Sequence, residues 1–65
     1  MTITVNGDAR ELPAGTTVAQ LLEQLKFMPR NVAIELNRRL LRSDRYETAL
    51  KDNDAVEIVT FVGGG

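Results

Sequence analysis

The chain has 65 residues, which is enough for one small domain and excludes a multidomain enzyme. Hydrophobic residues make up 43% and charged residues 26% of it, a balance typical of a folded domain rather than a disordered tail. The net charge of -1 argues against a nucleic-acid partner, and the absence of Cys and His excludes disulfides, Cys/His zinc sites and Cys or His nucleophiles.

The N-terminal segment predicts a β-hairpin. Residues 2–6 alternate polar and apolar, and Asn6-Gly7-Asp8 is a tight-turn signal because Gly accepts a positive φ. The return strand covers 9–12, and Pro13-Ala14-Gly15 ends it. This N-terminus lacks the basic and apolar regions of a signal peptide, and no apolar run approaches the ~20 residues that span a bilayer. We therefore expect a cytoplasmic protein with no membrane partner.

An amphipathic helix is predicted to follow. Thr17 and Gln20 have the capping-box spacing at its start. Pro29 disfavours helical geometry at the preceding residue, so the helix should end near Lys26 or Phe27. Apolar residues at i, i+3, i+4 and i+7 form a stripe that should pack on a sheet, namely Val18, Leu21, Leu22 and Leu25.

The second half of the chain predicts further strands. Residues 32–36 alternate as a strand, and a turn at 37–39 leads to a short strand at 40–42. Residues 43–50 lack a clean period, and we expect an irregular segment with one or two helical turns. A turn at 51–54 precedes the last and most β-prone strand, 55–61.

The two faces of this last strand differ in character. If Glu57 faced inward it would be buried without a visible partner, which is costly, so we place Val56 and Ile58 in the core. Val59 and Phe61 are then exposed on the opposite face, next to the C-terminal segment. Adjacent exposed apolar residues predict a partner-docking patch, the alternative being that Phe61 folds back over the sheet edge.

This order of elements predicts an α+β fold of the β-grasp type. It is a mixed four- to five-stranded sheet with one main helix on one face, and the first and last strands pair in parallel at its centre. One helix covers only one face of such a sheet, so the other face is left to solvent or to a partner.

The terminal Gly63-Gly64-Gly65 is the most unusual feature. If residues 62–65 are extended, they reach ~13 Å beyond the domain at about 3.3 Å per residue. Glycines lack a Cβ, so such a tail can enter a channel too narrow for other residues and can present its carboxylate inside a partner's active site. We expect a single domain over 1–65 with a flexible Gly tail at 63–65. The alternative is a frayed end or a cloning remnant.

With these features in place, the sequence resembles the sulfur carrier protein of thiamine biosynthesis, a ubiquitin-like β-grasp family. The resemblance covers essentially the whole chain, and Arg38 stands where much of the family has a Gly. It is carried by the terminal glycines and by Ile3-Thr4-Val5-Asn6-Gly7, Thr17-Val18, Val32-Ala33-Ile34-Glu35-Leu36-Asn37 and Asp54-Ala55-Val56-Glu57-Ile58-Val59-Thr60-Phe61-Val62.

The resemblance implies a protein co-substrate rather than an enzyme, with no catalytic side chain, metal or cofactor. A ubiquitin-activating-enzyme-like adenylyltransferase would convert the Gly65 carboxylate to an acyl-adenylate with ATP, while Gly63 and Gly64 thread its active site. Sulfur from a donor such as a cysteine desulfurase would then replace one oxygen, and the thiocarboxylate would go to thiazole synthase. The alternatives are a carrier for molybdopterin synthesis or tRNA thiolation, and an interaction module with an incidental tail.

Overall fold

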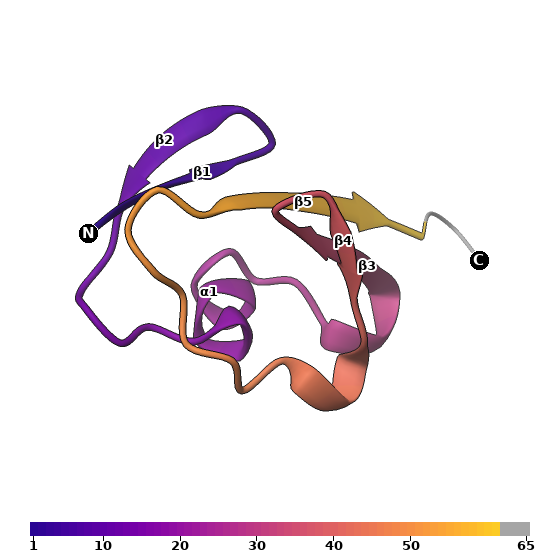
Figure 1. Ribbon diagram of the computed structural model, residues 1–65. Coiled ribbons are helices and arrows are strands. Elements are labelled where there is room, and N and C mark those ends of the chain that lie inside the picture. Colours follow the sequence, from indigo (N-terminus) through magenta and orange to yellow (C-terminus); the bar gives the residue numbers. More distant parts are fainter. Residues whose placement is uncertain (62–65) are drawn as a thin grey trace.

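A five-stranded mixed sheet organises the chain, and α1 lies on one of its two faces (Figure 1). The computed structural model describes residues 1–61. The sheet order is β2-β1-β5-β3-β4, in which β1 and β5 are parallel and the other pairs antiparallel. The predicted β-grasp fold is therefore confirmed. The elements are β1 (Thr2–Val5), β2 (Asp8–Glu11), α1 (Val18–Gln24), the 3-10 helix η1 (Pro29–Asn31), β3 (Val32–Leu36), β4 (Arg39–Leu41), the 3-10 helix η2 (Ser43–Arg45) and β5 (Ala55–Thr60).

The first hairpin forms at the predicted turn. Asn6 and Gly7 both have positive φ, 50° and 88°, which is the geometry of the two-residue turn that matches the twist of the flanking strands. The register pairs Val5 with Asp8 across this turn. A Gly at the second position adopts the left-handed conformation without steric cost.

The start of α1 is closed by the chain itself. The predicted capping box is present: the Gln20 amide donates to Thr17 Oγ1 at 3.1 Å, and the Thr17 amide donates to Gln20 Oε1 at 2.9 Å. The Val18 and Ala19 amides donate to the carbonyls of Thr48 and Tyr46 at 3.1 and 2.8 Å. The segment after η2 is thereby tied to the helix.

The helix ends at Gln24, earlier than the expected Lys26 or Phe27. Lys26 has a φ of 65°, and its amide donates to the carbonyl of Glu23, while the Phe27 amide donates to the carbonyl of Leu22. This pair of bonds is a Schellman motif, which ends a helix at a left-handed residue. Met28, which precedes Pro29, is extended as predicted, and Pro29 begins η1.

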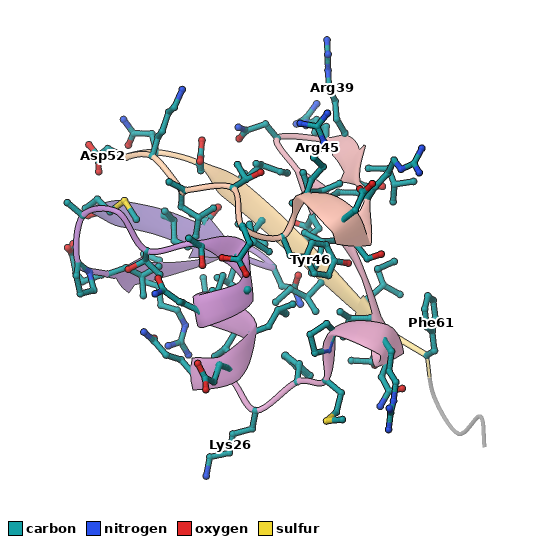
Figure 2. The ribbon with its side chains drawn as sticks, turned by 90° about the horizontal axis from the view of Figure 1, so that it is seen from below. Lys26, Arg39, Arg45, Tyr46, Asp52 and Phe61 are labelled. Carbon is teal, nitrogen blue, oxygen red and sulfur yellow. The ribbon has the colours of Figure 1, made fainter. Side chains whose placement is uncertain are left out.

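The core lies between α1 and the sheet. Val18, Leu21 and Leu22 are fully buried and belong to one cluster with buried residues of β1, β3 and β5. Leu25, which we expected in the core, is only partly buried because it caps the helix. Tyr46 lies inside the molecule, and burial raises the pKa of its hydroxyl (Figure 2). Among the helices of residues 1–61, none is long and apolar enough to cross a membrane.

Candidate functional site at the end of the central strand

The central strand β5 is the last strand before the terminal glycines in the sequence. It lies between β1 and β3 and joins the two halves of the sheet (Figure 1). The predicted roles of Gly63, Gly64 and Gly65 fall outside the described residues and stay predictions. The described part of the site is therefore the strand that carries the tail and the surface around its end.

Hydrogen bonds hold β5 on both sides almost to its last residue. On one side β3 pairs with β5 from Val56 to Thr60, and the Phe61 amide donates to the carbonyl of Asn31 at 2.8 Å. On the other side the register with β1 stops at Val56. Beyond that point the Asn6 side chain replaces the backbone of β1 as the hydrogen-bond partner of β5. Its Oδ1 accepts from the Ile58 amide at 2.7 Å, and its Nδ2 donates to the Ile58 carbonyl at 3.2 Å.

Asn6 thus has a second role that the sequence analysis missed. Its backbone forms the hairpin turn, and its side-chain amide presents to β5 the donor and acceptor that a further residue of β1 would present. No sequence signal distinguishes an Asn of this kind from an ordinary turn Asn, since both occur in Asn-Gly. The side chain fixes the part of β5 that precedes the tail.

We expect Asn6→Gly to lower the free energy of unfolding by about 1 kcal/mol net, because two hydrogen bonds to β5 are lost while the turn is kept. Denaturant unfolding measures the change in the free energy of unfolding, and hydrogen exchange of the Ile58 amide measures the loss of protection at β5. The matched control is Asn53→Gly, at another exposed residue of positive φ, 72°. Equal exchange at Ile58 in wild type and Asn6→Gly would contradict the role of the side chain.

The phase of β5 agrees with the sequence prediction. Val56 and Ile58 are buried, and Glu57 is exposed. Val59 and Phe61 are 58% and 60% exposed, and Phe61 stands out from the end of the strand (Figure 2). The predicted apolar surface at the end of β5 is therefore present, and its use in docking stays a prediction.

The sheet face opposite α1 carries further residues that the sequence analysis did not single out. Leu40 on β4 is 70% exposed and lies opposite Glu35 on β3. Glu35 in turn lies opposite Glu57 on β5. These neighbours depend on the register of β3 with both adjacent strands, which the sequence pattern alone does not supply. Within residues 1–61, no group of three or more His, Cys, Asp and Glu side chains is placed to hold a metal ion.

Comparison with known proteins agrees with this architecture. The crystal structure of the thiamine biosynthesis protein ThiS from Geobacter metallireducens is 36% identical, superposes with a TM-score of 0.82 and covers 100% of both chains. The sulfur carrier protein ThiS of Bacillus subtilis is 40% identical over 50 residues, which are 75% of this chain and 76% of that protein.

A longer relative matches over the same region. The thiazole synthase of Magnetococcus marinus is 39% identical over 66 residues, which cover all of this chain but only 20% of that protein. The present chain thus spans a fifth of that relative. The sequence model of the ThiS family matches residues 3–65, and the chain therefore belongs to the ThiS family.

Proposed function

We propose that this chain carries sulfur for the thiazole ring of thiamine, as a thiocarboxylate on Gly65. The observation that carries the proposal is a central strand that is hydrogen-bonded on both sides and is followed closely in the sequence by three glycines. The relatives named as thiamine biosynthesis and sulfur carrier proteins support this pathway over a carrier for molybdopterin or tRNA thiolation.

The chemistry requires little of the chain's own side chains. A carboxylate is a poor electrophile until one of its oxygens becomes part of a good leaving group. The Gly65 carboxylate attacks the α-phosphorus of ATP and pyrophosphate leaves, which gives an acyl-adenylate. A persulfide on the sulfur donor then attacks the acyl carbon and AMP leaves, which gives an acyl disulfide. A thiol cleaves its S–S bond by attacking the donor's sulfur, and the thiocarboxylate leaves while the thiol and the donor form a disulfide. The chain acts as a co-substrate, and its partners supply the catalytic groups.

Three kinds of partner follow from this chemistry. A ubiquitin-activating-enzyme-like adenylyltransferase activates the tail, a sulfur donor such as a cysteine desulfurase supplies the sulfur, and thiazole synthase receives it. The relative from Magnetococcus marinus supports the last of these, because a segment like this chain lies within a protein named thiazole synthase. Joining two proteins in one polypeptide raises the effective concentration of each at the other.

Val59 and Phe61 are proposed to dock the enzyme that receives the tail. We expect Phe61→Asp to weaken binding to the adenylyltransferase or to thiazole synthase by ~2 kcal/mol or more, because an exposed aromatic beside an apolar neighbour is a typical interface anchor. Titration calorimetry measures the affinity, and thermal melting should be almost unchanged because Phe61 is 60% exposed. The control Ala14→Asp adds the same charge at an exposed loop residue. Binding of Phe61→Asp with wild-type affinity to both enzymes would overturn the docking role.

Intact mass spectrometry of the protein purified from its own cells tests the function. We expect a population heavier than the unmodified chain by the difference between sulfur and oxygen, located on Gly65 by fragmentation. The population should disappear in cells that lack the adenylyltransferase. A mass that places further residues after Gly65, or a sulfur-free protein from thiamine-starved cells, would refute the proposal.

A further inference from the structure

Two glutamates face each other at the centre of the sheet. The register of β3 with β5 places Glu35 directly opposite Glu57, and both side chains are exposed. Opposite residues of antiparallel strands have Cβ atoms about 4.5–5.5 Å apart, and like charges at such positions are destabilising. We call Glu35 and Glu57 the glutamate pair.

The described part of the chain does not neutralise this repulsion. Within residues 1–61 the ion pairs are those of the Met1 amino group with Glu11 and of Arg42 with Asp44. Neither includes a member of the glutamate pair. The sheet thus contains two adjacent like charges without a cation within ion-pair distance in the described residues.

Exposed apolar side chains flank the glutamate pair. On the edge strand β4, Leu40 lies opposite Glu35. On β5, Val59 is the next residue after Glu57 on the same face, and Phe61 follows Val59. Their side chains are 70%, 58% and 60% exposed, and among residues 1–61 they are three of the four large apolar residues that are exposed. The surface therefore combines apolar area with a concentrated negative charge, and it extends to the residue that precedes the tail segment.

We infer that this face binds a protein surface on which a basic side chain, best an arginine, is surrounded by apolar residues. An arginine has enough donors to bond both carboxylates at once, and its planar group is less strongly hydrated than an ammonium. Contact of the apolar residues excludes water and strengthens these charged hydrogen bonds. A phosphate-rich surface, of nucleic acid or of an anionic membrane, is repelled by the same pair.

The inference rests on the proposed function in one respect, which is that thiazole synthase is taken as the partner. The apolar residues would supply contact area, and the glutamate pair would select the orientation in which the tail points into the active site. Charged groups at an interface fix register and exclude wrong partners more than they add raw affinity. The glutamate pair is therefore a specificity determinant rather than a catalytic group.

The test compares two double variants that change the net charge equally. One is Glu35→Gln with Glu57→Gln. The control is Glu23→Gln with Glu47→Gln, at exposed glutamates on α1 and in the segment tied to α1. Titration calorimetry with purified thiazole synthase from the same organism, at low and high salt, should give a Kd about tenfold higher or more for the first variant and a nearly wild-type Kd for the control. The salt dependence of Kd should fall only in the first variant.

Thermal unfolding separates binding from stability. The first variant should melt at the wild-type temperature or above it, because the repulsion between the carboxylates is removed. Equal Kd values for the two double variants, or tighter binding by the first, would overturn the role of the glutamate pair and leave the sulfur-carrier function untouched. No binding by the wild type would overturn the choice of partner, while the mass of the Gly65 thiocarboxylate tests the carrier function separately.

Discussion

Leu22→Ala is expected to lower the free energy of unfolding by ~2–5 kcal/mol, the usual cost of removing a buried leucine and leaving a cavity. Leu22 is 0% exposed and belongs to the cluster between α1 and the sheet. A chain of 65 residues has a total stability of only ~3–10 kcal/mol. The substitution therefore removes a substantial share of the stability and, at the lower end of that range, unfolds the chain.

Chemical denaturation and thermal melting measure this effect, with Glu23→Ala as the control on the exposed side of the same helix. The partly buried Leu25 provides a graded comparison, since its replacement by alanine should cost less than that of Leu22. A melting temperature that is the same for Leu22→Ala and Glu23→Ala would show that the helix packs differently.

Adding one residue after Gly65 is expected to abolish ATP-dependent adenylation, because the proposed acceptor is the Gly65 carboxylate and the extension converts it to a peptide bond. Exchange of labelled pyrophosphate into ATP with the cognate adenylyltransferase measures the reaction. Melting should be unaffected, since the change lies beyond the bonded part of β5. Adenylation of the extended chain at the wild-type rate would contradict the assignment of the acceptor.

Gly64→Val complements the extension, because it keeps the carboxylate and adds a side chain beside it. We expect normal folding and slow adenylation if the tail enters a close-fitting channel, since the new Cβ has no space there. Loss of activity in the extended chain together with full activity in Gly64→Val would mean that the terminal carboxylate matters and the width of the channel does not.

Local signals predicted much of this fold because each corresponds to one physical cause. Asn6-Gly7 indicated a turn with positive φ, and Thr17 with Gln20 indicated a capped helix start; both are observed. The cost of burying a charge predicted which residues of β5 face the core, and Glu57 is exposed as expected. The predicted end of the helix was wrong because the left-handed residue of a Schellman motif is usually a Gly, which the sequence would show. Here Lys26 adopts that conformation instead.

Features that depend on pairing between distant segments were not predictable in this way. Asn6 contacts Ile58 across the parallel junction of β1 and β5, and the glutamate pair exists only in one register of β3 with β5. A shift of that register by one residue would move one glutamate to the opposite face. For the candidate site, the sequence therefore predicted the exposed apolar residues Val59 and Phe61 but not the side chains that hold β5 or lie beside these two residues.

The position of β5 has a consequence for the order of folding. Two hairpins, β1 with β2 and β3 with β4, are joined only through β5, which follows all of them along the chain. Contacts between such distant segments form slowly, and the sheet cannot close until β5 has been synthesised and inserted. If β5 detaches, the two hairpins lose their common neighbour, and β5 loses both of its partner strands. An activating enzyme that binds both the sheet and the tail would therefore adenylate only chains whose folding is complete. Such selection would act as quality control without a separate chaperone.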